Sequence, residues 1–95
     1  MEISVSANTV KIKGNIKTVS DYQDIKNTID TIVAGDKRVT IHIIDSISIT
    51  SSVIGYFNKL VLKDGVDISI IVGNEQLKEL FDDLSLTSLF KVKKG

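Results

Sequence analysis

The run Val39-Thr40-Ile41-His42-Ile43-Ile44 constrains the fold more than any other part of the chain. Its residues are almost all β-branched, a type that favours strands. Because the run is nearly continuous in apolar character, it predicts a central strand that is buried on both faces. Helical patterns stand on either side of it in the sequence. A strand between two helices predicts parallel neighbouring strands joined by right-handed crossovers.

The helix that precedes this strand is predicted by a single apolar stripe. Residues spaced three and four apart share one face of a helix, and here they are Tyr22, Ile25, Ile29, Ile32 and Val33. Ser20 with Gln23 matches a capping box at the start of the helix. Gly35 predicts the C-terminal stop.

Two further helices are predicted after the central strand. The first runs from Ser52 to Lys63. Its inward-facing residues are predicted to be Ile54, Phe57, Leu60 and Val61. Asn74 is a suitable N-cap for the second helix. The apolar residues of that short helix are Leu77, Leu80, Phe81 and Leu84.

The remaining apolar segments alternate with a period of two, which is typical of half-buried strands. Ile3 and Val5 lie before the polar turn Ala7-Asn8, and Val10 and Ile12 lie after it. Two strands joined so closely predict an antiparallel hairpin. A later strand of the same kind contains Val66, Ile68, Ile70 and Val72.

The C-terminal segment carries the weakest pattern. Leu89–Val92 predicts a final strand or an extended tail, and Lys93–Gly95 is expected to fray. With 95 residues the chain has room for one domain with one core. We therefore expect a single α/β domain over residues 1–95. It has an open mixed sheet, a hairpin followed by β-α-β-α-β order, and helices packed mainly on one side.

The composition excludes several classes of function. Twelve basic and twelve acidic residues leave no net charge, which weighs against direct nucleic-acid binding, because phosphate contacts need an excess of Lys and Arg. No cysteine is present, so disulfides and thiol chemistry are excluded, as fits a reducing cytoplasm. Met1–Val5 lacks the features of a signal peptide, and no apolar run approaches the ~20 residues that span a membrane. We expect a cytoplasmic domain without membrane insertion.

The residues of conventional active sites are missing. His42 is the only imidazole and lies within the apolar strand pattern, where a histidine is more often structural than catalytic. A zinc site would depend almost entirely on carboxylates, and the glycines form no phosphate-binding pattern. We expect no metal, no cofactor and no enzymatic activity. A small enzyme or ligand-binding domain that depends on His42 is the less favoured alternative.

Hydroxyl side chains are concentrated over Ile47–Gly55, where the central strand has ended and a helix begins. A helix N-terminus gathers unpaired N–H groups and a partial positive charge. Ser51 and Ser52 therefore have two alternative roles. They either cap the helix or carry a group that another protein adds.

Two neighbouring features accompany these serines. Ser46 and Ser48 are expected to hydrogen-bond within the turn after the central strand. Gly55 lies inside the expected helix, where glycine costs ~1 kcal/mol relative to alanine. Two interpretations of Gly55 are open: it allows close packing of the first helical turn on the sheet, or it leaves a smooth surface for a partner that approaches the serines.

Three segments resemble parts of a known family. Val39–Gly55 is similar to an apolar strand followed by Asp-Ser-Ser-Gly-Leu-Gly. Asp64–Gly73 is similar to a helix–glycine–strand segment, and Leu84–Phe90 to a segment that closes the domain. In this order they resemble a STAS domain, the fold of bacterial anti-sigma factor antagonists. The resemblance covers nearly the whole chain and implies a STAS-like domain over residues 1–95.

The resemblance implies a regulatory protein–protein interaction module. In such antagonists a loop serine is phosphorylated by an anti-sigma factor that is itself a serine kinase. The unmodified form binds the kinase and releases the sigma factor, and a phosphatase resets the switch. By resemblance, this chain is expected to be a phosphoprotein of signal transduction and transcription regulation. Its partners would be a serine kinase/anti-sigma factor-like protein and a phosphatase.

Two registers of the serine motif place the phosphorylated residue differently. Alignment of Thr50-Ser51-Ser52 with Asp-Ser-Ser makes Ser51 the acceptor. Alignment of Ser51–Gly55 with the Asp-Ser-Phe-Ile-Gly of stressosome-type members makes Ser52 the acceptor. The second register is slightly preferred, because it keeps Ile47 and Ile49 in apolar positions. The residues expected to contact the partner are Ile49, Thr50, Val53 and Gly55.

The chain departs from the family in three places. Thr50 or Ser51 replaces the acidic residue of the motif, and Lys17 stands where members often have an acidic residue. The chain ends soon after Phe90, so the family's usual last helix is expected to be missing. The missing acidic residues leave an alternative function open: a non-phosphorylated STAS subunit of a lipid transporter or signalling scaffold.

Overall fold

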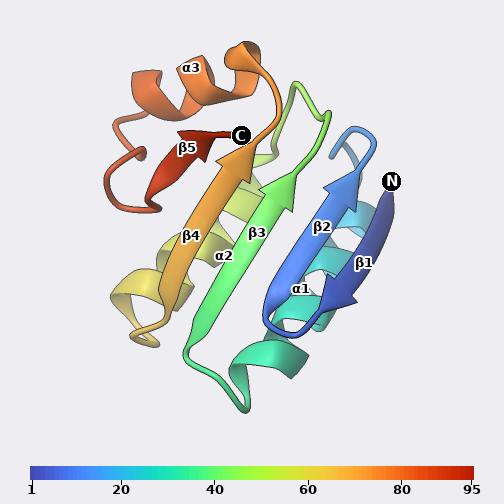
Figure 1. Ribbon diagram of the computed structural model, residues 1–95, viewed down its shortest axis with the longest axis vertical. Helices are drawn as coiled ribbons and strands as arrows, with labels where there is room; N and C mark the ends of the chain where they lie inside the picture. The colour runs from blue at the N-terminus through green and yellow to red at the C-terminus, as the bar shows by residue number, and fades with distance from the viewer.

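The computed structural model describes residues 1–95 as a twisted sheet with helices packed against it (Figure 1). Five strands form the sheet, and helices connect most of them. The bounds of the elements are β1 Glu2–Ser6, β2 Thr9–Lys13, α1 Val19–Val33, β3 Arg38–Ile43, α2 Ser51–Leu62, β4 Asp67–Val72, α3 Glu75–Asp83 and β5 Val92–Lys94.

The strands lie in the sheet in their chain order, β1-β2-β3-β4-β5. The first two form the predicted antiparallel hairpin, and each later strand runs parallel to the one before it. A helix connects each parallel pair, as parallel strands require a crossover. The predicted fold class is confirmed: an α/β domain with an open mixed sheet, a hairpin at its start and helices mainly on one side.

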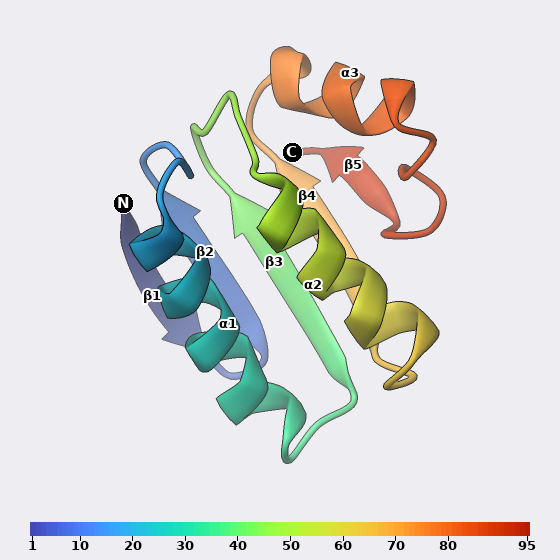
Figure 2. The same cartoon turned by 180° about the vertical axis from the view of Figure 1, so that it is seen from behind.

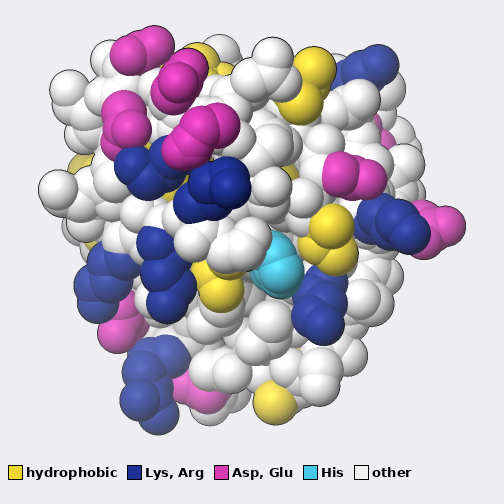
Figure 3. Space-filling model, turned by 45° about the horizontal axis from the view of Figure 1, so that its top comes forward, with side chains coloured by type: hydrophobic (Ala, Val, Ile, Leu, Met, Phe, Trp, Pro, Cys, Tyr) yellow, Lys and Arg dark blue, Asp and Glu magenta, His cyan; other side chains and the backbone are white.

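The two faces of the sheet differ. α1 and α2 cover one face, and no helix covers the opposite face of β1 to β4 (Figures 1 and 2). Along β3, Val39, Ile41 and Ile43 are buried, whereas Thr40 and His42 are half-buried on the open face. Figure 3 shows the histidine at the surface, with basic and hydrophobic side chains next to it. The prediction that this strand is buried on both faces is wrong, because burial of the second face needs another covering layer.

Three aromatic rings fill the core where α2, α3 and the segment before β5 meet. The ring centroids of Phe57 and Phe90 are 5.9 Å apart, and those of Phe81 and Phe90 are 6.2 Å apart. Both pairs meet edge to face, a favoured geometry for aromatic rings. Phe90 lies in the turn before β5 rather than in the predicted strand, and it is fully buried.

The end of the chain is more ordered than the sequence predicts. β5 pairs in parallel with β4, and Lys93 lies opposite Ile71. The Gly95 N–H donates to the Val72 carbonyl at 3.0 Å. The prediction that Lys93–Gly95 frays is therefore wrong, since backbone hydrogen bonds to β4 hold the segment in the sheet.

α1 begins earlier than the predicted capping box. Thr18 is the N-cap, and its hydroxyl accepts a hydrogen bond from the Asp21 N–H at 3.0 Å. The Asp21 carboxylate accepts in turn from the N–H groups of Lys17 at 2.9 Å and Thr18 at 3.0 Å. The box predicted at Ser20 and Gln23 is wrong, because Thr18 and Asp21 satisfy the same reciprocal pattern one half-turn upstream. The N–H bond from Lys17 is the main reason that the pKa of Asp21 lies below its usual value.

The predicted apolar stripe of α1 and the predicted N-cap of α3 are both confirmed. Ile25 and Ile29 are fully buried on the predicted stripe of α1, which ends just before the predicted stop at Gly35. Asn74 caps α3 as predicted, and its side-chain oxygen accepts from the Leu77 N–H at 2.8 Å. The spacing identified the buried residues of these two helices, but the predicted apolar residue Leu84 follows the end of α3 and is 46% exposed.

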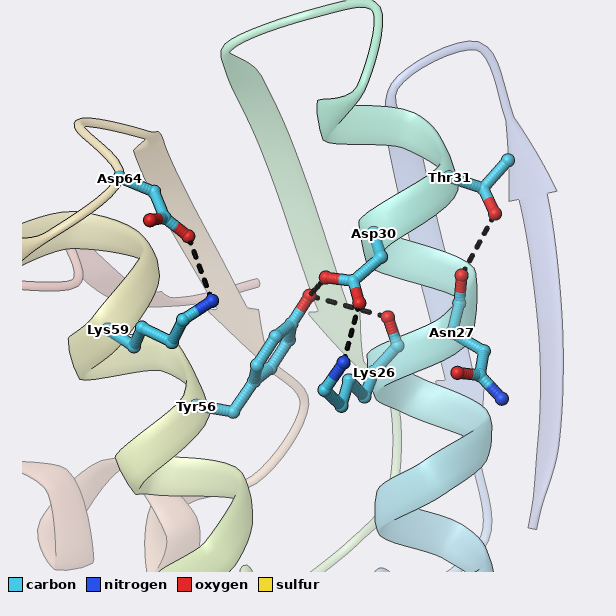
Figure 4. Close-up of polar contacts among 7 residues, drawn as sticks. All are labelled: Lys26, Asn27, Asp30, Thr31, Tyr56, Lys59 and Asp64. Atoms are coloured by element: carbon cyan, nitrogen blue, oxygen red, sulfur yellow. Dashed lines mark hydrogen bonds and ion pairs between the residues drawn. The ribbon is translucent and has the colours of Figure 1, made fainter.

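A polar cluster fastens α1 to α2 (Figure 4). The Tyr56 hydroxyl donates to the Asp30 carboxylate at 2.5 Å, and the Lys26 ammonium pairs with the same carboxylate at 2.8 Å. Burial of Tyr56, followed by its bond to Asp30, raises the pKa of the Tyr56 phenol. Burial alone would raise the pKa of Asp30, but the bonds from Lys26 and Tyr56 outweigh burial and lower it. The Tyr56 hydroxyl is the group of this cluster that connects α2 to α1.

Candidate functional site

The candidate site lies at the edge of the sheet where β2, β3 and β4 end. The carboxyl ends of parallel strands meet at one edge, and the loops that follow them lead into α1, α2 and α3 (Figure 2). A Cβ on Gly73 would lie 1.8 Å from the Ile44 carbonyl oxygen, so only glycine fits beside the end of β3. The loop from Ile44 to Thr50 is therefore packed tightly from the β4 side.

Ser46 is the anchor of this loop. Its hydroxyl accepts from the Ile16 N–H at 3.1 Å and the Ser48 N–H at 3.3 Å, and it donates to the Ser48 carbonyl at 2.6 Å. The Ser48 hydroxyl donates to the Ile16 carbonyl at 3.2 Å. Ser46 is 0% exposed and is the single polar residue in the buried set. The prediction that Ser46 and Ser48 bond within the turn is confirmed, and both also bind the loop that precedes α1.

Further hydrogen bonds connect this loop to its neighbours. The Ile47 N–H donates to the Asn15 side chain at 3.1 Å, and the Gly14 N–H donates to the Asp45 carboxylate at 2.6 Å. The Asn74 side-chain amide donates to the Ser46 carbonyl at 2.8 Å. These bonds connect the loops after three strands. The start of α2 is thus held in a defined position relative to the starts of α1 and α3.

Thr50, and neither serine, caps α2. Its hydroxyl accepts from the Val53 N–H at 3.3 Å, and its carbonyl accepts from the Ile54 N–H at 3.1 Å. Ser51 and Ser52 are the first two residues of the helix, are exposed, and make no side-chain hydrogen bond. The interpretation of these serines as caps is therefore wrong. Both residues are exposed at a helix start that does not depend on their hydroxyls.

The start of α2 differs electrostatically from the other two helix starts. α1 has Asp21 and α3 has Glu75 in the first turn, whereas α2 has no acidic residue there. The N–H groups of Ser51 and Ser52 also have no hydrogen-bond partner. The partial positive charge of this helix end is therefore not neutralised by the chain itself.

The structure separates the residues expected to contact a partner. Gly55 is exposed, and Ile49 and Thr50 are half-buried next to the serines. Val53 is 0% exposed, so its predicted contact with a partner is wrong. It belongs to the face of α2 that packs on the sheet, together with Tyr56, Phe57 and Leu60.

Gly55 and Ile47 also contribute to the surface around the serines. A Cβ on Gly55 would meet no atom within 4 Å, so close packing on the sheet does not explain this glycine. Ile47 is 53% exposed, and sequence reasoning did not include it among the contact residues. Its position between Ser46 and Ser48 was the available signal, because one anchored hydroxyl on either side directs the intervening side chain outward.

His42 does not join this site. It lies on the open face of the sheet, between Lys11 of β2 and Ile71 of β4 in the register. α2 and its serines lie on the other face (Figures 1 and 2). The predicted place of His42 inside an apolar strand is therefore only half right, because one side of that strand is open.

The surface has no pocket, and no group of three or more His, Asp or Glu side chains is arranged to hold a metal ion. None of the helices is both long enough and apolar enough to cross a membrane. No family model, no curated protein and no solved structure matches this chain.

Proposed function

We propose that this protein is a regulatory interaction module of the cytoplasm, switched by phosphorylation of Ser51 or Ser52. The observation that carries the proposal is the state of these two residues. Both are exposed, neither hydroxyl is hydrogen-bonded, and the helix they begin is capped by Thr50. A kinase can therefore modify either serine without breaking a bond that the fold uses.

The helix start supports a phosphate at this position. A phosphoserine carries about −1.5 to −2 charges at pH 7. The first turn of α2 offers the unpaired N–H groups of Ser51 and Ser52 and has no carboxylate to repel the phosphate. The helix dipole contributes about 0.3–1 kcal/mol at an exposed site. Phosphorylation is therefore expected to leave the fold intact.

The cap favours Ser51 as the acceptor. In the register that makes Ser51 the acceptor, Thr50 replaces an acidic residue, and both Thr and Asp are good N-caps. Thr50 supplies the cap bond, so this replacement preserves the local structure while it removes one charge. The preference for Ser52 relies on Ile47 and Ile49 in apolar positions. Only Ile49 packs against the core, because Ile47 is largely exposed.

The contact surface for the partner consists of the exposed and half-buried residues around the serines. Ile47 supplies an exposed apolar side chain, Ile49 a partly buried one, and Gly55 a position without a side chain. A partner seated on this surface must desolvate a phosphate on Ser51 or Ser52. A penalty of ~3–4 kcal/mol would lower the affinity several-hundredfold. We propose a serine kinase of the anti-sigma type as the partner that binds the unmodified form, and a phosphatase that resets it.

The experiment has two stages. The protein is incubated with ATP and a lysate of its native cell, and the phosphorylated residue is located by mass spectrometry. The kinase responsible is then purified, and its affinity is measured for the unmodified protein and for the Ser51→Asp and Ser52→Asp variants. We expect phosphate on one of the two serines and a loss of affinity of at least a hundredfold for the corresponding aspartate variant.

Ser88→Asp is the matched control, because Ser88 is an exposed serine in the turn before β5, away from the start of α2. It is expected to leave the affinity unchanged. Absence of phosphate from both Ser51 and Ser52, together with equal binding by all variants, would contradict the proposal. Binding to a transporter ATPase or a large assembly that ignores all three substitutions would instead support the unmodified structural subunit.

A further inference from the structure

The two edges of the sheet are not equally protected. At one edge β5 has three residues, two of them lysines, and α3 packs against it. At the other edge β1 has five residues and no element beyond it (Figure 1). Unpaired edge strands expose backbone N–H and C=O groups that can pair with another chain, and lysines and short strands are common protections. β1 contains neither lysine nor proline.

The hairpin determines which backbone groups of β1 are free. Only Ala7 and Asn8 separate the paired residues Ser6 and Thr9. In such a two-residue hairpin the flanking pair exchanges both hydrogen bonds, and hydrogen-bonded pairs then alternate along the strands. Glu2, Ser4 and Ser6 therefore direct their backbone groups toward β2. The N–H and C=O groups of the two intervening residues point away from the sheet.

Those intervening residues are Ile3 and Val5, and they allow β1 to pair with itself. In an antiparallel pair of two β1 strands centred on Ser4, Ile3 of one copy lies opposite Val5 of the other. Both residues have outward backbone groups, so each such pair exchanges two hydrogen bonds. Glu2 lies opposite Ser6, so no like charges face each other. The register is complementary in its hydrogen bonds and in its charges.

The side chains of β1 favour the same pairing as its backbone groups. Ile3 and Val5 share the helix-covered face with Ile12 and Val10 of β2. Val5 is nevertheless 50% exposed, and it stands out as an apolar residue on an open edge. Pairing of two β1 strands places Val5 against Ile3 of the second copy and removes this apolar surface from water.

We propose that β1 pairs with β1 of a second copy of this chain, so that the five-stranded sheets join into one antiparallel dimer. The two-fold axis is perpendicular to the sheet, which keeps the helices of both copies on one face. The starts of α2 then lie at opposite ends of the joined sheet. The dimer is therefore independent of the proposed phosphorylation switch, and both serine sites stay accessible in it.

Cysteine cross-linking tests the register directly, because the chain has no cysteine of its own. In the proposed dimer the two Ser4 residues form a non-hydrogen-bonded pair with Cα atoms about 4.5 Å apart, within the range that a disulfide spans. Ser4→Cys is expected to form a disulfide-linked dimer under mild oxidation. Ser6→Cys is the matched control: its two copies would be about 14 Å apart along the strands, so it is expected to form no disulfide-linked dimer.

Analytical ultracentrifugation over a range of concentrations supplies the second measurement. The mass of the unmodified protein is expected to rise toward twice the 10.4 kDa of one chain. Val5→Lys adds a charge to the exposed edge and is expected to weaken association at least tenfold, with circular dichroism unchanged. A mass equal to that of the monomer at every concentration would overturn the proposal. Disulfide cross-linking of Ser6→Cys at the same rate as Ser4→Cys would also overturn it.

Discussion

The starts of α1 and α2 are built on the same plan but differ in charge. Both follow the end of a strand, both have a threonine as N-cap, and both have an exposed serine two residues after it, Ser20 in α1 and Ser52 in α2. At α1 the next residue is Asp21, whose carboxylate accepts two backbone hydrogen bonds. At α2 the corresponding residue is Val53, which is buried in the core.

This difference shows that two helix starts with the same cap geometry can differ in how their partial positive charge is neutralised. α1 neutralises its own N-terminal partial charge with a carboxylate, so its first turn is complete without any partner. α2 has an apolar residue in the same position, and this residue packs in the core. The partial positive charge of the α2 N-terminus can therefore interact with an added phosphate. The proposed modification site is therefore the helix start that lacks an internal anion.

The largest effect is expected from Ser46, because its hydroxyl connects the loops ahead of both helices. Ser46→Ala leaves the Ile16 N–H buried without its partner, which is expected to lower the free energy of unfolding by about 2 kcal/mol. Urea denaturation measures this change. Ser88→Ala, at an exposed serine with no side-chain hydrogen bond, should unfold at the same urea concentration as the unmodified protein; an equally small effect of Ser46→Ala would show that the loop is not anchored as described.

The next effect separates α1 from α2 by its pH dependence. Asp21→Ala removes the reciprocal cap of α1 and is expected to cost about 1 kcal/mol at neutral pH. Because the pKa of Asp21 is lowered in the folded state, its contribution is fully present above the unfolded pKa of about 3.9 and is lost as the pH falls through the folded value. The unmodified protein should therefore lose more stability than Asp21→Ala in acid. Parallel curves of unfolding free energy against pH would contradict the assignment.

Removal of the α2 cap is expected to have a similar or slightly smaller effect. Thr50→Ala should lower the free energy of unfolding by about 1 kcal/mol, because the Val53 N–H then has no acceptor. Thermal unfolding followed by circular dichroism measures it. Ser51→Ala and Ser52→Ala are the controls and should change stability little, since neither hydroxyl is bonded. A larger loss of stability in either serine variant would show that this serine caps the helix.

The smallest effect compares equivalent positions on the two helices. Ser52→Asp places a carboxylate at a helix start that has none, and it is expected to raise stability by about 0.3–1 kcal/mol. Ser20→Asp places the same group beside Asp21, so repulsion between the two carboxylates should cancel most of the gain. Both are measured by urea denaturation at low salt, and equal gains in the two variants would show that the two helix starts do not differ in charge.

Residue spacing alone predicted much of this molecule. Period-two alternation located β1, β2 and β4, and the three-and-four spacing located α1 and the inward residues Phe57 and Leu60 of α2. These patterns are reliable because each depends only on which residues of a local segment share a face. The candidate serines also came from the sequence, since a strand end that leads into a helix is visible in the order of residues.

The structure corrected the predictions that depend on distant contacts. Thr40 and His42 of β3 are half-buried, because no second layer covers that face of the sheet. The cap of α1 is a local correction, since Thr18 and Asp21 are only three residues apart. Val53 and Ile54 are adjacent apolar residues, and only the way α2 packs on the sheet determined that Val53 is fully buried.

The amino-acid sequence by itself determined the elements, their order and the hydroxyl-rich segment between Ile47 and Gly55, because these follow from short-range periodicity and turn chemistry. Only the tertiary structure decided that one face of β3 is open, that Ser46 and Ser48 also bind the loop before α1, and that β1 is an unprotected edge. These properties depend on contacts between segments that are far apart in the chain. Burial of apolar surface and hydrogen bonds stabilise such contacts, and a local sequence pattern does not reveal them.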